Sequence, residues 1–276
     1  MDYADQMDIR NYGAKCDGVT DDTDAIQRVL ERIPLNADGA HRDSQVVVYF
    51  PPLRTLVSRT LKIVSPGSIL RGVGLCGGDN RQGRNAVSTL VAAANFSGAA
   101  VVSGSPEHVN AFWHLLGWYG LSEVRGIGIS NICVDLTRSP GVTAFKMRSL
   151  SNCPAWSECS MIGGTGLGFD FAGAQVPVGP YSLPCEGLVL RNCYVYGGMS
   201  SNGGSMGLEQ TAPMMRLAGC NEVKIDAGKF LYDFANAQSP HPAILVESEI
   251  LKRDALFANL PTISTGVHFT DVSTGN

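Results

Sequence analysis

The sequence predicts an all-β fold made of many short strands, preceded by one amphipathic helix near the N-terminus. Glycine accounts for 32 of the 276 residues and proline for 14, without a collagen-like period, which indicates many turns. Hydrophobic residues make up 44% of the chain and charged residues 17%, so the protein can bury a large core. Frequent turns within an apolar chain favour short strands over a helical bundle.

The helix is expected to run from Asp22 to Ile33 and to end before Pro34. Apolar residues at positions i, i+3, i+4 and i+7 form one stripe: Ile26, Val29, Leu30 and Ile33. Asp21 or Asp22 is predicted to cap the helix, because a carboxylate accepts hydrogen bonds from the free amides of the first turn. An EF-hand calcium loop is excluded, since the acidic spacing is wrong and no glutamate closes a 12-residue loop.

The same stretch resembles the opening of a known superfamily. "IRNYGAKCDGVTDDTDAIQRVL", followed by "VVVYFPP", is similar to the N-terminal motif of pectate-lyase-like right-handed parallel β-helices, a grouping that includes phage tailspikes, polysaccharide depolymerases, β-1,3-glucanases and relatives of polygalacturonase. Cys16 stands where the motif usually has glycine, and Leu53-Arg54-Thr55 where Gly-Thr-Tyr is usual. The resemblance implies a single-stranded right-handed parallel β-helix, with a cap at residues 1–45 and the solenoid at residues 46–276.

Two series of strand-like runs recur along the chain, as a solenoid of stacked coils requires. The first series starts at residues 142, 167, 213, 243 and 266, so its spacings are 25, 46, 30 and 23 residues, close to one or two coils each. The second series reads "GISNICVDL", "AWSECSMIGG", "GLVLRNCYVYGG" and "CNEVKIDAGKF". Residues 174–184 and 200–210 interrupt the period and are predicted to be loops on one side of the solenoid, where such folds usually carry function.

Asparagines fall at similar places beside the strands of the second series. Because asparagine tolerates the left-handed conformation, all four are predicted to be turn residues. They are Asn131, Asn152, Asn192 and Asn221.

An aromatic segment at residues 108–120, "HVNAFWHLLGWYG", holds two of the three tryptophans. Aromatic side chains offer flat faces to sugar rings, so Trp113, Trp118 and Tyr119 are predicted to bind a polysaccharide. The alternative is that the same residues form core under a loop.

Charge and motif searches exclude several functions. The net charge is −4 and no run of Lys or Arg occurs, so nucleic acid is not expected as a partner. No apolar run is long enough to span a membrane, and "MDYADQMDIR" is no signal peptide, so either a leader has been removed or the protein is made in a cytoplasm. "GVGLCG" fits the glycine pattern of a dinucleotide-binding site, but no helix is expected after it. "GGSMG" fits the pattern of a nucleophile elbow, but it lacks the strand before it and the helix after it that an elbow needs.

No metal or other cofactor is expected. The eight cysteines form no C-x-x-C pair, and the five histidines show no H-x-H or i, i+4 pair. Several cysteines lie in strand-like runs, where a free thiol packs as a small apolar group. Reduced core cysteines are therefore favoured, with a disulfide between Cys153 and Cys159 as the open alternative.

Carboxylates remain as the source of chemistry. Glycoside cleavage needs two of them about 5 to 10 Å apart, and acids on one face of neighbouring coils approach that distance because coils stack at roughly 4.8 Å. Asp170 in "GFDF" has apolar neighbours, which would suit a general acid, and Glu186 and Glu209 border the two loops. These three are the predicted catalytic residues, and the alternative is that each is a solvated outward acid. Further candidates are Asp135, Glu158, Glu222 and Asp226.

The sequence supports three functional hypotheses. The first is a tailspike-like protein, virion-associated or extracellular, that forms a homotrimer and binds and cleaves a cell-surface polysaccharide along an acidic groove. Cleavage is expected to be glycoside hydrolysis ahead of elimination. The second is a non-catalytic adhesive phage tail protein, favoured because the polygalacturonase and pectate lyase catalytic signatures are missing. The third is a secreted glucanase-like fragment, since that branch usually has two β-helices and this chain would hold only the first.

Overall fold

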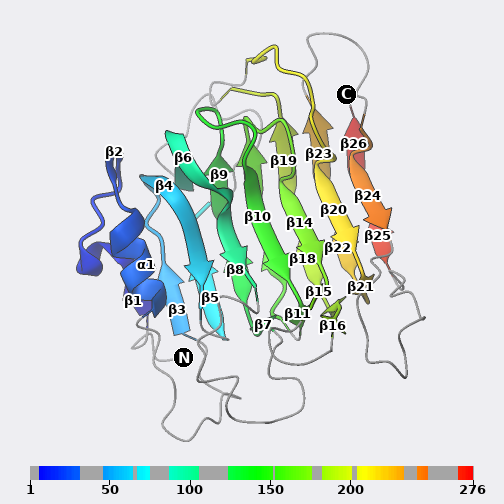
Figure 1. Ribbon diagram of the computed structural model, residues 1–276, viewed down its shortest axis with the longest axis horizontal. Coiled ribbons are helices and arrows are strands. Elements are labelled where there is room, and N and C mark those ends of the chain that lie inside the picture. Colours follow the sequence, from blue (N-terminus) through cyan, green and yellow to red (C-terminus); the bar gives the residue numbers. More distant parts are fainter. Residues whose placement is uncertain are drawn as a thin grey trace, which may run out of the picture.

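The computed structural model shows a parallel β-helix with one α-helix near its N-terminus, and the predicted fold class is confirmed (Figure 1). It describes residues 6–31, 46–64, 67–74, 87–105, 124–151, 153–175, 182–200, 204–232, 241–247 and 267–275. Strands of successive coils pair in parallel, and each coil has up to four faces, which we number 1 to 4.

Face 1 is one eight-stranded sheet and face 4 a four-stranded sheet. Face 1 contains β1 (Gln6–Asp8), β3 (Val46–Tyr49), β5 (Ser68–Arg71), β8 (Gly128–Ser130), β12 (Trp156–Ser157), β18 (Val189–Arg191), β22 (Lys224–Asp226) and β25 (His268–Thr270). Face 4 contains β7 (Val124–Arg125), β11 (Leu150–Ser151), β17 (Cys185–Glu186) and β21 (Cys220–Asn221).

Faces 2 and 3 share a twelve-stranded sheet, because the long strands β4 (Arg54–Ile63) and β6 (Ser88–Gly104) run through both. Face 2 adds β2 (Asp17–Asp21), β9 (Ile132–Asp135), β13 (Ser160–Ile162), β19 (Tyr194–Gly197), β23 (Lys229–Tyr232) and β26 (Ser273–Gly275). Face 3 adds β10 (Thr143–Arg148), β14 (Phe169–Ala172), β20 (Met215–Ala218) and β24 (Ile244–Glu247). A short antiparallel hairpin, β15 (Ala174–Gln175) with β16 (Ser182–Leu183), follows β14.

The core consists of columns of inward side chains, one from each coil. On face 1 the column is fully buried, and its members are Val48, Leu70, Ile129, Trp156, Leu190 and Ile225. Aromatic rings of face 3 meet this column: Trp156 contacts Phe145 and Phe171 edge-on, with centroids 5.9 and 5.3 Å apart. Phe145 also stacks on Phe169 of the next coil, 5.2 Å away. The interior is therefore filled by direct contact between faces 1 and 3.

Left-handed residues turn the chain between faces 1 and 2 in every coil from β8 onward. They have φ between 50° and 57° and form one column: Asn131, Glu158, Asn192, Ala227 and Asp271. The amides of the first four bond a carbonyl of the next coil, as Asn131 N does with Ser157 O at 2.9 Å. The turn prediction is confirmed for Asn131 and Asn192, whereas Asn221 lies in strand β21 and its neighbour Glu222 takes the left-handed conformation. Asn152 lies outside the described residues.

The first series of strand-like runs was partly misread. Its first four members are β10, β14, β20 and β24, which are consecutive strands of face 3. The 46-residue spacing is therefore one coil with a long connection at residues 198–214, not two coils. The fifth run, "GVHFTD", contains β25 and belongs to face 1, because it pairs with β22.

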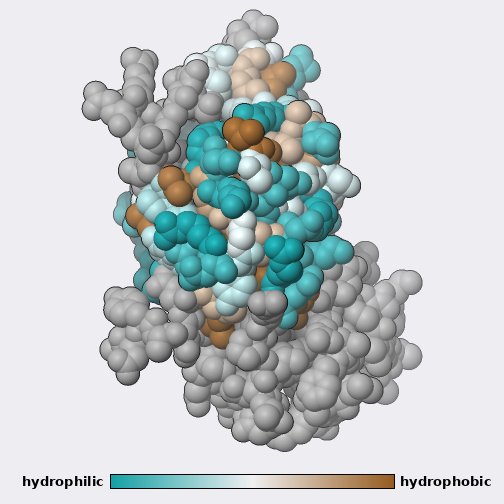
Figure 2. Space-filling model, turned by 90° about the vertical axis from the view of Figure 1, so that its left-hand side faces the viewer, coloured by the Kyte–Doolittle hydropathy of each residue, from teal (hydrophilic) through white to brown (hydrophobic). Residues whose placement is uncertain are grey.

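The N-terminal helix α1 spans Thr23–Glu31, starting one residue later than predicted, and residues 32–45 are outside the described part of the chain. A short 3₁₀ helix, η2 (Ile9–Tyr12), lies beside it. The buried stripe of Ile26, Val29 and Leu30 joins the core cluster. Figure 2 views this end, where hydrophilic side chains predominate around a few separate hydrophobic ones. The division at residue 45 stays a prediction, although β1 and β2 already pair with β3 and β4.

The two predicted capping aspartates have different partners. Asp21 Oδ1 accepts the Thr23 amide at 3.1 Å, as a cap should. The buried carboxylate of Asp22 instead turns back to the preceding loop, where it accepts the amides of Lys15 at 2.7 Å and Cys16 at 2.8 Å. Cys16 has φ 53°, which explains why glycine is usual at this position of the motif.

None of the described cysteines forms a disulfide, so Cys153 and Cys159 are not bonded to each other. Cys159 is buried next to Cys193 of the following coil, and burial raises the pKa of its thiol. No helix within the described ranges is long and apolar enough to cross a membrane.

We expect Asp22→Ala to lower the free energy of unfolding by about 1–3 kcal/mol, because it leaves the buried Cys16 amide and the part-buried Lys15 amide without an acceptor. The measurement is urea unfolding at pH 7. Asp24→Ala is the matched control, since Asp24 is exposed and pairs only with the exposed Arg59; it should cost less than about 1 kcal/mol. Equal effects of the two substitutions would contradict this role of Asp22.

The cap should also lose stability in acid. Burial raises the pKa of Asp21, but hydrogen bonds from Ser58 and Thr23 outweigh it, and the net pKa is lowered from 3.8. A lowered pKa in the folded state means that stability is present above the ordinary pKa and is lost as the pH falls below it. The melting temperature should therefore drop below about pH 4, and less steeply in Asp21→Asn. An identical pH profile in the variant would refute the assignment.

Candidate functional site

Face 3 carries a cluster of charged side chains on its outer surface. Its strands bury alternate residues, such as Phe169 and Phe171 of β14, so that the residues between them point outward. Register places the outward residues of four neighbouring strands together. We call the resulting set the face-3 cluster: Lys146, Arg148, Asp170, Arg216 and Glu247.

Asp170 is the centre of the face-3 cluster. Its Oδ2 accepts a hydrogen bond from Arg148 Nη2 at 2.5 Å, and its Oδ1 one from Arg216 Nη1 at 3.3 Å. Arg148 also donates to the backbone oxygen of Asp170 at 3.1 Å, which fixes the guanidinium against the strand. Arg216 Nε continues the chain of contacts to Glu247 Oε1 at 2.5 Å. Four members of the cluster therefore form one connected network across four coils: Arg148, Asp170, Arg216 and Glu247.

The surroundings of Asp170 differ from the sequence-based expectation. Its apolar sequence neighbours Phe169 and Phe171 point into the core, so they do not surround the carboxylate. The carboxylate instead lies between two guanidinium groups, with 7% of its side chain exposed. The expected apolar environment is wrong, because alternation along a strand sends adjacent residues to opposite sides. Charge-assisted bonds on both oxygens stabilise the carboxylate anion.

The cluster contains three cations and two anions, so this face is not the acidic surface that the overall charge predicted. Lys146 has no ion-pair partner among the described residues and lies beside Asp170 in the register. Its ammonium group is therefore available to an external anion.

The face-3 cluster supplies a pair of carboxylates that the sequence reading missed. Asp170 and Glu247 both bond the same guanidinium of Arg216. Their nearest oxygens are therefore less than about 8 Å apart, which does not exceed the separations found for carboxylate pairs in glycosidases. Glu247 is the more accessible of the two, with 37% of its side chain exposed.

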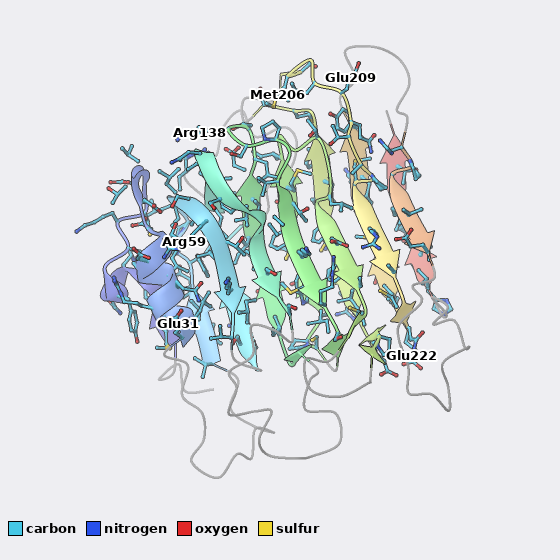
Figure 3. All side chains as sticks on the ribbon, viewed as in Figure 1. Glu31, Arg59, Arg138, Met206, Glu209 and Glu222 are labelled. Atoms are coloured by element: carbon cyan, nitrogen blue, oxygen red, sulfur yellow. The ribbon has the colours of Figure 1, made fainter. Side chains whose placement is uncertain are left out.

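The other predicted catalytic residues lie elsewhere. Glu186 is an exposed residue of β17 on face 4, paired in register with Ser151 and Asn221. Glu209 is an exposed residue of the connection at 198–214 and lies beyond the ends of the strands in Figure 3. Its charge acts on Tyr232 of face 2: burial raises the pKa of Tyr232, and Glu209 raises it further. The structure thus does not join Asp170, Glu186 and Glu209 into one site.

The predicted sugar-binding residues Trp113, Trp118 and Tyr119 lie outside the described residues. The remaining carboxylate candidates are placed away from face 3. Asp135 is buried on face 2 and pairs with Arg54 at 2.7 Å. Glu158 and Glu222 are left-handed corner residues, and Asp226 of face 1 lies 3.8 Å from Lys224.

The two predicted loops border face 3 on opposite edges, not on one side of the solenoid. The β15–β16 hairpin follows the C-terminal end of β14, and the connection at 198–214 precedes the N-terminal end of β20 (Figure 1). The second connection is held down by Thr211, whose amide bonds Thr165 O at 2.7 Å, and by Tyr232, whose hydroxyl donates to Leu208 O at 3.1 Å. Both loops can therefore contribute to a ligand site on the same face.

A signal for the missed residues was present in the aligned runs. Each of the four runs begins with an inward apolar residue and has a charged residue one or three positions after it. The runs are "FKMR", "FDFA", "MRLA" and "ILVE". Reading these positions down the column, rather than along each strand, brings Lys146, Asp170 and Arg216 together.

Comparison with known proteins identifies a family model that matches residues 6–162, more than half of the chain; it is described as rhamnogalacturonase A/epimerase, pectate lyase-like. No curated protein sequence matches the chain.

Solved structures share the fold at low sequence identity. A candidate glycosyl hydrolase from Parabacteroides merdae has a TM-score of 0.51 and 13% identity, over 98% of this chain and 95% of that one. ORF18 of Geobacillus virus E2 has a TM-score of 0.43 and 12% identity, over 98% and 60% of the two chains. The A-module of mannuronan C-5 epimerase AlgE4 from Azotobacter vinelandii has a TM-score of 0.34 and 14% identity, over 98% and 88%.

We expect Asp170→Asn to destabilise the protein by about 1–3 kcal/mol, because it leaves two partly buried guanidinium groups without a carboxylate. Asp226→Asn is the control, since its ion pair with Lys224 is longer and more exposed; it should cost less than about 1 kcal/mol. Urea unfolding at pH 7 measures both. A neutral Asp170→Asn would show that the network does not hold face 3 together.

Proposed function

Because this chain belongs to the rhamnogalacturonase A/epimerase family of pectate lyase-like proteins, within the superfamily that its first 60 residues predicted, we propose that it binds an acidic polysaccharide along face 3 and cleaves it there. The family is carbohydrate-active, which supports a polysaccharide as the ligand. The cations of face 3 are the observation that carries the choice of an acidic one.

The cations recur along one outward column at every second coil. Strand pairing aligns five residues of successive coils in this column, and every second one is a cation. In order they are Lys62, Ser103, Lys146, Asp170 and Arg216. Two coils correspond to about 9.6 Å along the solenoid. This regular spacing suits an extended polyanion that lies parallel to the solenoid axis, with its acidic groups bound by lysine and by the fork of arginine.

The proposed cleavage is glycoside hydrolysis by the Asp170–Glu247 pair. Asp170, paired with Arg148 and Arg216, serves as the base that activates water. Glu247 has one arginine partner at 2.5 Å and is the more exposed of the two carboxylates, so it is the one assigned to reach the leaving oxygen and protonate it. Hydrolysis by this pair requires Arg216 to leave the space between the two carboxylates, so that a sugar bond and the attacking water can enter it. Glu186 and Glu209 stay predicted catalytic residues that the same experiment tests.

A non-catalytic adhesive function is the second candidate. Arg216 joins the two carboxylates directly, and this contact occupies the space between them where a sugar bond would be cleaved. A network that stays closed would bind a polysaccharide without cutting it.

The biological setting proposed from the N-terminal resemblance is that of a phage tailspike: a virion-associated homotrimer acting on a bacterial surface polysaccharide. The trimer would form by side-by-side contact of three solenoids. Sedimentation-velocity measurements at several protein concentrations test this, and a species of three chains is the expected result.

The deciding experiment measures depolymerisation of a panel of acidic and neutral polysaccharides. Reducing ends report hydrolysis, and near-ultraviolet absorbance reports the unsaturated uronates of a lyase. We expect reducing ends without absorbance, and a loss of about 10²–10⁴-fold in kcat for Asp170→Asn and Glu247→Gln. Glu186→Gln and Glu209→Gln are assayed in parallel. Full activity in both face-3 variants, or a rise in absorbance, would contradict the proposed hydrolase.

Binding is tested separately through Lys146. Lys146→Gln should weaken binding of the acidic polysaccharide about 5–10-fold and reduce its salt dependence, because it removes one cation from the column. Lys224→Gln, on face 1, is the matched control and should bind as the wild type does. Binding without cleavage in the unmodified protein would favour the adhesive function. Equal affinity of Lys146→Gln and the wild type would remove face 3 as the binding surface.

A further inference from the structure

Two cysteines of consecutive coils are stacked inside the solenoid on face 4. Cys185 of β17 is aligned directly with Cys220 of β21 in parallel register. Both side chains belong to the hydrophobic core and are 0% exposed. Their thiol groups interact with each other, so the two sulfur atoms already lie close together.

The spacing of this pair suits a disulfide bond. Aligned residues on neighbouring parallel strands have Cα atoms about 4.8 Å apart, and disulfides join cysteines whose Cα atoms are about 4.4–6.8 Å apart. The Cβ atoms of a disulfide are about 3.8 Å apart, so the two strands need to approach each other by about 1 Å at this point. β17 and β21 contain two residues each, and so short a ladder can make this local shift.

The surroundings of Cys185 favour its thiolate. Its Sγ accepts a hydrogen bond from the Leu150 amide at 3.4 Å. Burial raises the pKa of Cys185, but the hydrogen bonds from Cys220 and Leu150 and the positive charge of Arg148 outweigh it, and the net pKa is lowered. The thiolate is the form of cysteine that attacks a disulfide.

A second stacked pair differs in this respect. Cys159 and Cys193 directly precede Ser160 and Tyr194, which are aligned on face 2, so these two cysteines also lie one above the other. They are at most 1% exposed. Burial raises the pKa of Cys159, and its neighbour Cys193 raises it further. The second pair therefore has a similar spacing but favours the thiol form, which makes it an internal comparison.

We propose that Cys185 and Cys220 are a redox-active pair, which forms a disulfide between consecutive coils when the chain meets a disulfide oxidant such as glutathione disulfide. The Cys185 thiolate attacks one sulfur of the oxidant, releases one glutathione and forms a mixed disulfide. The Cys220 sulfur, after losing its proton, attacks Cys185 Sγ and releases the second glutathione. The two cysteines lose two protons and two electrons, which the two released glutathione molecules take up.

The disulfide forms at the edge of face 3. Cys185 follows β16 by two residues, and its Sγ donates to the backbone oxygen of Ala172, at the end of β14, at 3.1 Å. The bond therefore ties the base of the β15–β16 hairpin to the coil that follows it. It also closes a loop of about 35 residues, which removes conformations from the unfolded chain.

The test is peptide mapping of the full chain after refolding in a glutathione redox buffer. Refolding is needed because both thiols are buried, so that exchange takes place while the coils are open. Trypsin cleaves after lysine and arginine, which puts Cys185 in peptide 149–191 and Cys220 in peptide 217–224. We expect these two peptides to be joined by a disulfide. A link from peptide 149–191 to peptide 192–216, which holds Cys193, would overturn the proposal, and so would a chain whose thiols all stay reduced.

Substitutions identify the partner within peptide 149–191, because this peptide also contains Cys153 and Cys159. Cys185→Ser and Cys220→Ser should each abolish the link to peptide 217–224. Cys159→Ser is the matched control, since it alters an equally buried cysteine of the other pair, and the link should persist in it. A link that survives in Cys185→Ser would assign the bond to another cysteine and contradict the proposal.

Thermal melting gives a second readout. The oxidised wild type should melt about 5–15 °C above the reduced protein, and dithiothreitol should remove the difference. Cys185→Ser and Cys220→Ser should melt at the same temperature with and without dithiothreitol, whereas Cys159→Ser should keep the difference. Melting of each variant under reducing conditions shows that it is folded. The proposal does not depend on polysaccharide binding, so loss of activity leaves it standing.

Discussion

Every feature of this protein depends on one packing constraint: an inward side chain is buried only when the coils before and after it place their own side chains in the same column. A strand of two to four residues has too little surface to be stable alone. Stacked in register, however, short strands such as β12 and β18 align Trp156 and Leu190 in a column from which water is excluded. The solenoid is therefore stabilised coil by coil, and any coil without a neighbour leaves core residues exposed.

The same register that stacks the core also builds the outer surface. Because alternate residues of a strand point outward, fixing Phe145, Phe169 and Met215 in one inward column fixes Lys146, Asp170 and Arg216 in the outward column beside it. The charged network of face 3 thus needs no local motif. It follows from polar residues that occupy equivalent places in consecutive coils, and it brings together side chains up to 100 residues apart in the chain.

The ends of the solenoid show the cost of the packing constraint most directly. Helix α1 ends the columns at one side with a buried stripe, and its position depends on the Asp22 carboxylate that orders the loop before it. Farther along the solenoid, Phe269 and Val246 continue inward columns beyond Ile225 and Leu217, and with no later described strand beside them they are 48% and 43% exposed.

By itself, the sequence determined the fold class, the N-terminal helix and two of the corner asparagines, because each rests on a local signal. The helix follows from the apolar stripe of Ile26, Val29 and Leu30, and the fold class from the loop motif before it. The corners follow from the tolerance of asparagine for the left-handed conformation. It also selected Asp170 as a site candidate. Only the tertiary structure decided that Asp170 lies between Arg148 and Arg216 with Glu247 nearby, while Glu186 and Glu209 lie elsewhere. The physical reason is that connections of unequal length separate the coils, so sequence spacing does not reveal which residues share a column.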